Sequence, residues 1–195
     1  MWMWNDFSCP YNCSYCPQGT HKGETAPKSY TGKEPSARRA IDNAFDPYKQ
    51  ITARLDQFES IGHPTDKCEL IIMGGTFPST PTEFQEHLIK RSFDALNGQD
   101  ADNIEEAHTL NEAGEHRCVG LTVETRPDFA KPAHIDNFLE WGTTRIEMGV
   151  QTLDDAVQDR TQRGHGTKEV IETTQRLKDC GFKVCYHMML GLPGE

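Results

Sequence analysis

The residues with the clearest chemical potential are three cysteines in the stretch CPYNCSYC. Cys9, Cys13 and Cys16 follow the spacing C-x3-C-x2-C. Three thiolates this close repel one another unless a cation holds them, so the spacing predicts a metal centre. The chain has seven cysteines, an odd number, and the others are scattered along it. A disulfide framework is therefore disfavoured.

Two kinds of metal centre fit this spacing. Zinc prefers four nitrogen or sulfur ligands, and His21 follows Cys16 closely enough to complete a site of three cysteines and one histidine. A [4Fe-4S] cluster held by the three cysteines would instead leave one iron without a protein ligand. A small molecule could chelate that open iron. The spacing favours the cluster and leaves zinc as the alternative.

Alternating strands and helices must position these cysteines. The predicted strands are short apolar runs, and the predicted helices begin near proline and end at glycine. The strands cover 68–75, 118–128, 144–152 and 182–194, and the helices cover 36–61 (interrupted at Pro47), 81–98, 131–142 and 167–181. This order, without hairpin signals, predicts a parallel sheet, either open and doubly wound or barrel-shaped.

Unusual polar residues and glycines gather at the predicted carboxyl ends of the strands. In parallel α/β folds this edge carries the functional groups, so the position indicates a site. The residues are Gly74, Gly75, Thr76, Glu124, Arg126, Glu147, Gln151 and the segment 187–195.

Composition limits the classes of protein that the chain can represent. The 195 residues suit one domain, and we find neither an apolar run of about 18 residues nor a signal peptide. We therefore expect a cytoplasmic protein without a membrane partner. The net charge of −10 argues against nonspecific nucleic-acid binding, and no DNA partner is expected. The stretch 21–40 is nevertheless locally basic.

The cysteine spacing, with Tyr15 before the last cysteine, resembles the signature of the radical S-adenosylmethionine (SAM) superfamily. The glycine motif of that superfamily resembles MGGT at 73–76. The resemblance implies a partial (β/α)6 barrel of parallel strands with outer helices. It also implies a [4Fe-4S] cluster and SAM, which together generate a 5′-deoxyadenosyl radical.

A closer resemblance extends over essentially the whole chain. The stretches that carry it include SYTGKEPSARRAI, IIMGGTFP, VGLTVETRPD, RGHGT and GLPGE. They are similar to the catalytic subunit family of Elongator and its archaeal-type relatives. The resemblance implies an acyltransferase-class enzyme that uses SAM and acetyl-CoA to carboxymethylate the wobble uridine of tRNA.

The same resemblance implies roles for individual residues. The three cysteines would bind the cluster, and Gly74, Gly75 and Thr76 would contact the amino group of SAM. Tyr15 and Glu124 would lie at the cofactor, Arg126 would bind its carboxylate and Gln151 would lie near its ribose. Lys67 would bind acetyl-CoA. The residues expected to face tRNA are Lys28, Tyr30, Lys33, Arg38 and Arg39, with the ring of Tyr30 available for stacking on a base.

Each assignment has a structural alternative. Glu124 and Arg126 could form an ordinary ion pair, the two glycines could simply turn the chain, and Lys67 could be a surface lysine. His187 is interpreted as a core histidine and left outside the site. Arg38 and Arg39 are adjacent, so on a helix they diverge by about 100°.

The domain organisation is expected to be an incomplete radical SAM core over 1–195. The acetyltransferase-like domain and the basic amino-terminal tRNA-binding segment of the family are not recognised in the chain. The expected partners are tRNA, an electron donor and a partner subunit or the missing domains. Two alternatives remain: a radical SAM enzyme with another substrate, and a zinc-stabilised RNA-binding module.

Overall fold

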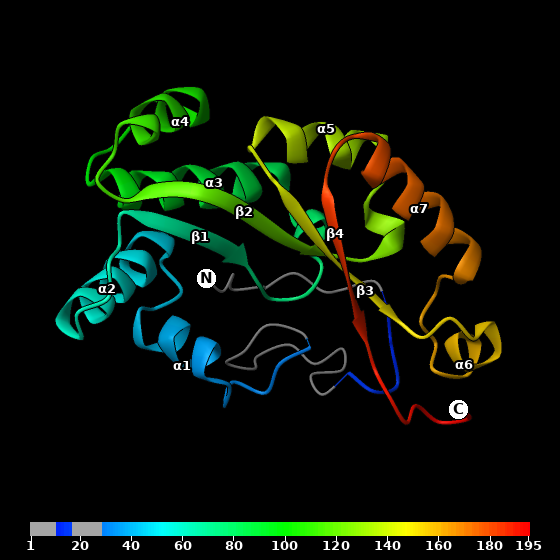
Figure 1. The fold of residues 1–195 in the computed structure, drawn as a ribbon. Coiled ribbons are helices and arrows are strands. Elements are labelled where there is room, and N and C mark those ends of the chain that lie inside the picture. Colours follow the sequence, from blue (N-terminus) through cyan, green and yellow to red (C-terminus); the bar gives the residue numbers. More distant parts are fainter. Residues whose placement is uncertain (1–10, 17–28) are drawn as a thin grey trace.

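A computed structural model describes residues 11–16 and 29–195 of the chain, and its centre is a parallel sheet (Figure 1). The strands β1 (Lys67–Ile72), β2 (Arg117–Thr125), β3 (Arg145–Gln151) and β4 (Lys183–Met188) lie in chain order, each parallel to its neighbours. The sheet does not close on itself. The predicted α/β class is thus confirmed, and the open sheet is consistent with a partial barrel.

Helices cover one face of the sheet. The helices α3 (Thr82–Asn97), α5 (Pro132–Glu140) and α7 (Thr167–Asp179) lie along this face, while α1 (Pro35–Asp42) and α2 (Pro47–Ser60) lie beside β1 (Figure 1). One continuous apolar core joins the sheet to α2, α3, α5 and α7. Its largest fully buried side chains include Trp141, Phe77, Phe138, Ile72 and Ile89. The burial of this large apolar surface is the main driving force for the fold.

The helix boundaries follow the punctuation in the sequence. The helical stretch predicted over 36–61 forms two helices, α1 and α2, with the predicted interruption at Pro47, which begins α2. Asp46 caps α2 by accepting from the backbone N–H of Lys49 at 3.0 Å. Gly98 ends α3 with a φ of 66°, a conformation that glycine adopts without a steric penalty.

Two short helices were not predicted from the sequence. They are α4 (Ile104–Glu112), capped by Asn103, and α6 (Asp155–Arg160), capped by Asp154. Each is nine residues or fewer and carries too few apolar turns to produce a clear period. Two 3-10 turns, η1 (Phe77–Ser79) and η2 (Pro127–Phe129), follow β1 and β2.

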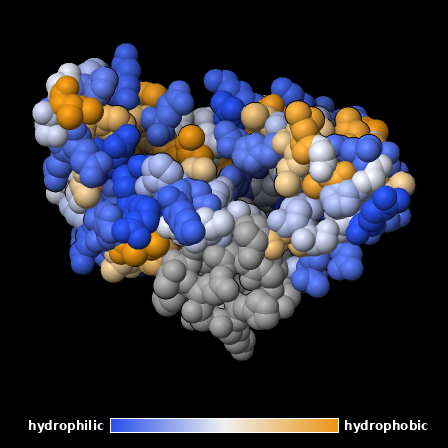
Figure 2. All heavy atoms as spheres, turned by 90° about the horizontal axis from the view of Figure 1, so that it is seen from below, coloured by the Kyte–Doolittle hydropathy of each residue, from blue (hydrophilic) through white to orange (hydrophobic). Residues whose placement is uncertain are grey.

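The other face of the sheet is less covered by helices (Figure 1). Seen from below, this side is hollowed near its middle, and many of the side chains around the hollow are hydrophilic (Figure 2). In the part of the chain that the structure describes, no helix is both long and apolar enough to cross a membrane.

Candidate cluster and cofactor site

The described part of the cysteine loop is a tight turn bound to the loop that follows α6. The N–H of Cys16 donates to the carbonyl of Cys13 at 2.9 Å, which places both cysteines on one turn. The N–H of Ser14 donates to the carbonyl of Thr161, just after α6, at 3.0 Å. Cys13 is buried and Cys16 is partly buried. Cys9, predicted as the third ligand, and His21, the alternative zinc ligand, lie outside the described residues.

The residues after β2 hold this loop in place. The guanidinium of Arg126 stacks on the ring of Tyr11, with Cζ 3.6 Å from the ring centroid. The hydroxyl of Tyr11 donates to Asp128, and Arg126 binds the same carboxylate through Nε at 2.9 Å and Nη2 at 3.3 Å. Arg126 is only 4% exposed. A buried charge paired in this way is held in one orientation.

A second buried guanidinium meets the first at Cys13. Nη1 of Arg126 lies 3.7 Å from the Sγ of Cys13, and Nη1 of Arg163 lies 3.8 Å from it. Burial alone would raise the pKa of the Cys13 thiol, but Arg163 and Arg126 outweigh that effect and lower it. The two guanidinium groups thus shift Cys13 toward the thiolate, the form that binds metal.

Gly164 completes this group, which we call the cysteine seat: Tyr11, Arg126, Asp128, Arg163 and Gly164. A Cβ on Gly164 would lie 2.6 Å from the ring of Tyr11. Sequence reasoning quoted RGHGT but assigned no role to Arg163, Gly164, Tyr11 or Asp128. Asp128 ends one predicted strand, and Arg163 and Gly164 follow the next, which was a usable signal. Tyr11 precedes every predicted strand, and the mutual contacts of all four residues depend on the tertiary fold.

The glycine motif forms a turn that is bound by Glu124. The N–H groups of Gly74 and Gly75 donate to the Oε2 of Glu124 at 3.0 and 3.2 Å. The φ angles of the two glycines are 128° and 93°, which side chains rarely permit. In a planar trans peptide the C=O points away from the N–H, so the carbonyls of Met73 and Gly74 point away from Glu124. Backbone carbonyl oxygens are acceptors that an ammonium group can donate to.

Glu124 therefore does not pair with Arg126, as the structural alternative supposed. It also accepts from the hydroxyl of Tyr30 at 2.9 Å. Burial, with Glu124 as the next cause, raises the pKa of Tyr30. Tyr30 is partly buried and packs against Ala37 and Ala40. Its predicted stacking on a base stays a prediction.

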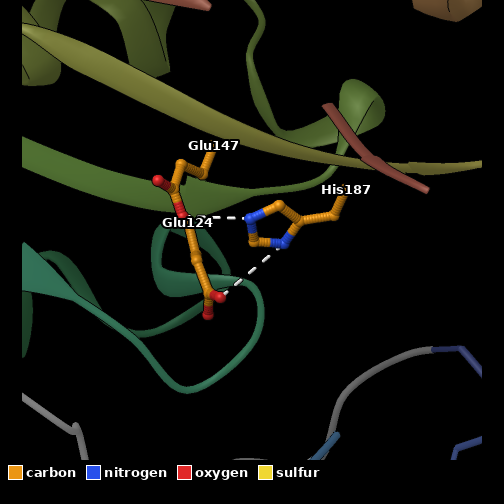
Figure 3. Close-up of side chains that lie close together, drawn as sticks. All are labelled: Glu124, Glu147 and His187. Atoms are coloured by element: carbon orange, nitrogen blue, oxygen red, sulfur yellow. Dashed lines mark hydrogen bonds and ion pairs between the residues drawn. The ribbon is translucent and has the colours of Figure 1, made fainter. Parts of the chain in front are cut away.

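Glu124 continues into a row of polar side chains on three adjacent strands (Figure 3). Nε2 of His187 on β4 lies 3.0 Å from the carboxylate of Glu147 on β3, and its Nδ1 lies 3.9 Å from that of Glu124 on β2. Glu124 and Glu147 are register partners. The side chain of His187 is 42% exposed. The prediction of a core histidine was therefore wrong, because His187 lies on the face of the sheet that is less covered by helices.

A small cavity joins the cysteine loop to the glycine motif. Its volume is about 40 Å³. Its lining includes several residues predicted for the cluster and cofactor: Cys13, Tyr15, Cys16, Gly75, Thr76 and Arg126. Burial is the main cause that raises the pKa of Tyr15 to about 12. The donor set fits the implied group, because thiolates suit iron and two glycines allow close approach of backbone to a ligand.

Gln151 ends β3 in a left-handed conformation, with a φ of 72°. Such a conformation is unusual for a residue with a side chain and is often found at functional sites. The side-chain amide of Gln151 lies beside Gly149, since a Cβ on Gly149 would be 3.1 Å from the Nε2 of Gln151. Its predicted position near a ribose stays a prediction.

A second, larger cavity lies between α2 and the edge strand β1. Its volume is about 560 Å³, and we call it the Lys67 pocket. Its cations are Arg39, Arg54 and Lys67, and its apolar lining includes Ile51, Leu55, Phe58 and Leu70. The basic residues predicted to face tRNA thus separate: Arg39 lines this pocket, while Lys33 and Arg38 are exposed. Lys28 lies outside the described residues.

A parallel sheet with buried thiols and a glycine turn at its carboxyl edge defines the class of the protein. The family model of the radical SAM superfamily matches residues 7–195, so the chain belongs to that superfamily. Within it, the chain is 50% identical over 190 residues to a tRNA uridine(34) acetyltransferase of Methanocaldococcus jannaschii. That match covers 96% of this chain and 35% of the relative.

Other relatives carry the same or a related name. A tRNA uridine(34) acetyltransferase of Dehalococcoides mccartyi is 47% identical, over 99% of this chain and 41% of the relative. Elongator complex protein 3 of Schizosaccharomyces pombe is 46% identical, over 93% of this chain and 34% of the relative. The chain thus spans roughly a third to two fifths of the length of these relatives.

Solved structures agree with this placement. The archaeal Methanocaldococcus infernus Elp3 with an amino-terminal deletion superposes with a TM-score of 0.79 at 48% identity, covering 80% of this chain and 37% of that one. The radical SAM methyltransferase TsrM of Kitasatospora setae, with cobalamin and a [4Fe-4S] cluster bound, superposes with a TM-score of 0.51 at 15% identity. That match covers 96% of this chain and 30% of TsrM, and it supports the fold alone.

Proposed function

We propose that this chain is the radical-generating core of an acyltransferase-class enzyme that carboxymethylates the wobble uridine of tRNA, using SAM and acetyl-CoA. The observation that carries the proposal is the cavity where Cys13 and Cys16 meet Gly75, Thr76 and Arg126. Membership of the superfamily and the names of the relatives support the reaction and its substrate. We also propose a cytoplasmic location and an external electron donor.

The residues of the chain divide the work of binding the cofactor. Cys9, Cys13 and Cys16 would bind three irons of a [4Fe-4S] cluster. The carbonyls of the glycine turn would accept from the ammonium group of SAM, while Glu124 fixes that turn from behind. When bound, the cluster and SAM supply one electron and a 5′-deoxyadenosyl radical that removes a hydrogen atom from the substrate. Arg126 and Arg163 would supply positive charge at the anionic cluster, because both meet the sulfur of Cys13.

Acetyl-CoA is proposed to bind in the Lys67 pocket. The pocket combines an apolar wall with three cations, which suits a ligand that has both an apolar chain and phosphates. A volume of about 560 Å³ can hold part of such a ligand. Arg39, predicted from the sequence to bind tRNA phosphates, is reassigned by this proposal to acetyl-CoA.

The exposed Lys33 and Arg38 remain proposed tRNA contacts. They lie near the start of α1 and extend toward solvent. Phosphate contacts of this kind supply affinity without sequence specificity. Tyr30, which donates to Glu124, is proposed to link the tRNA-facing segment to the glycine turn.

The test is anaerobic reconstitution with iron and sulfide, followed by addition of SAM and dithionite. We expect about four irons per chain and formation of 5′-deoxyadenosine. Cys13→Ala should lose both, while Cys180→Ala, an exposed cysteine outside the site, should keep both. Stimulation of cofactor cleavage by tRNA together with acetyl-CoA would support the substrate.

The same experiment separates the alternatives. One zinc per chain, with neither iron nor 5′-deoxyadenosine, would support a structural zinc site. Cluster binding and cofactor cleavage that respond to neither tRNA nor acetyl-CoA would support a radical SAM enzyme with another substrate.

A further inference from the structure

Arg126 is arranged so that a single corner of its guanidinium faces the sulfur of Cys13. Asp128 binds the edge formed by Nε and Nη2, and Nη2 also donates to the carbonyl of Arg163 at 2.5 Å. Tyr11 covers the flat face of the guanidinium. Nη1 is left directed at the Sγ of Cys13, at 3.7 Å. The contacts of Arg126 thus fix which nitrogen meets the sulfur.

The charges at this point are held in a buried environment. Arg126 and Cys13 are 4% and 8% exposed. Charges interact much more strongly at a buried site than in water, so a fixed guanidinium so close to a cluster ligand has a large effect. One-electron reduction of an iron–sulfur cluster adds a negative charge to it, and a nearby cation favours that form.

We infer that Arg126, held by Tyr11 and Asp128, is a positioning residue that raises the reduction potential of a cluster bound through Cys13. The inference rests on the proposed function, because it requires the cluster, but it assigns Arg126 to the sulfur rather than to the carboxylate of SAM. The carboxylate of Asp128 opposes this effect, since it lies on the same guanidinium. Removing the charge of Arg126 should therefore lower the reduction potential of the cluster, and removing the charge of Asp128 should raise it.

The test is a redox titration of the reconstituted protein with dithionite, followed by electron paramagnetic resonance of the reduced cluster, without SAM. In Arg126→Met we expect the ratio of reduced to oxidised cluster at a fixed potential to fall about tenfold, which corresponds to about 59 mV for one electron. Arg126→Lys should recover part of the shift. Asp128→Asn should raise the potential above that of the wild type.

Arg145→Met is the matched control. Arg145 is a cation at the amino-terminal end of β3, away from the cysteine seat, and its removal should leave the potential unchanged. If Arg126→Met does not take up iron, the potential of Asp128→Asn alone tests the inference. A loop loosened by Asp128→Asn gives no reason for a higher potential, so a rise must come from the lost negative charge. Unchanged potentials, or a fall in Asp128→Asn, would overturn the inference. A wild-type protein without a cluster would instead contradict the proposed function.

Discussion

The cysteine seat and the Lys67 pocket both contain cations and are both proposed to bind an anionic partner, but they hold their cations differently. In the seat, Arg126 and Arg163 are 4% and 6% exposed, and their donors are directed to Asp128, Cys13 and backbone carbonyls. In the pocket, Lys67 is exposed at the start of an edge strand. The seat is preorganised, whereas the pocket can adapt.

The two regions also differ in size. The cavity beside the seat measures about 40 Å³, and the Lys67 pocket about 560 Å³. Arg54, which lines the pocket, lies over the ring of Phe58, with Cζ 4.0 Å from the centroid. A cluster has one shape and needs a rigid site, while a flexible ligand with several phosphates can be bound by mobile cations. The difference indicates where substitution should be tolerated.

The largest effect on stability and iron content is expected from adding a single methyl group in the cysteine seat. Gly164→Ala places a Cβ 2.6 Å from the ring of Tyr11, at a φ of 82°. The left-handed conformation costs about 1–2 kcal/mol and the overpacking about 1–3 kcal/mol more. We expect lower stability in urea unfolding and a strong loss of iron per chain after reconstitution.

Gly62→Ala is the matched control beside the Lys67 pocket. Its φ is 81°, but a Cβ there meets no atom within 4 Å. Its free energy of unfolding should fall only by the conformational cost, about 1–2 kcal/mol, and it should keep its iron. Equal losses in the two variants would show that the seat is no more tightly packed than the pocket rim.

A moderate effect on CoA binding is expected from substitutions in the Lys67 pocket. Lys67→Ala and Arg54→Ala should each weaken CoA binding about fivefold, because one partly exposed charge pair is worth about 1 kcal/mol. Isothermal titration calorimetry at low and high salt would measure this, and the loss should shrink at high salt. Lys49→Ala, an exposed lysine of α2 outside the pocket lining, is the control. CoA binding that is equal in all variants would remove the pocket from the proposal.

At neutral pH the smallest effect is expected from His165, whose Nε2 accepts from the Nε of Arg163 at 3.0 Å. Burial, with Arg163 and Arg126 as the next causes, lowers the pKa of His165 to about 4, while Asp128 opposes the shift. A histidine with a lowered pKa binds fewer protons folded than unfolded. Its contribution to stability is therefore fully present above about pH 6.5 and is lost as the pH falls toward about 4.

Urea unfolding of the wild type and of His165→Gln between pH 7 and pH 4 measures that contribution. The wild type should lose more stability over this range than the variant. Parallel curves would mean that His165 contributes nothing to the acid sensitivity of the seat.

The sequence by itself predicted the four parallel strands, the main helices and the strand-end position of the site. These follow from local signals: short apolar runs, Pro47 and the terminating Gly98, which act within a few residues. It also predicted Cys13, Gly75 and Arg126 as neighbours, on a resemblance rather than on spacing. The cavity that they line agrees with that expectation.

Only the tertiary structure decided the partners of these residues. Arg126 could have met Glu124 or a ligand, yet it binds Asp128, Tyr11 and Cys13. Cys13 and Arg163 are 150 positions apart in the chain. A local pattern carries no information about contacts of that range, because they exist only when parallel strands bring their carboxyl ends to one edge of the sheet.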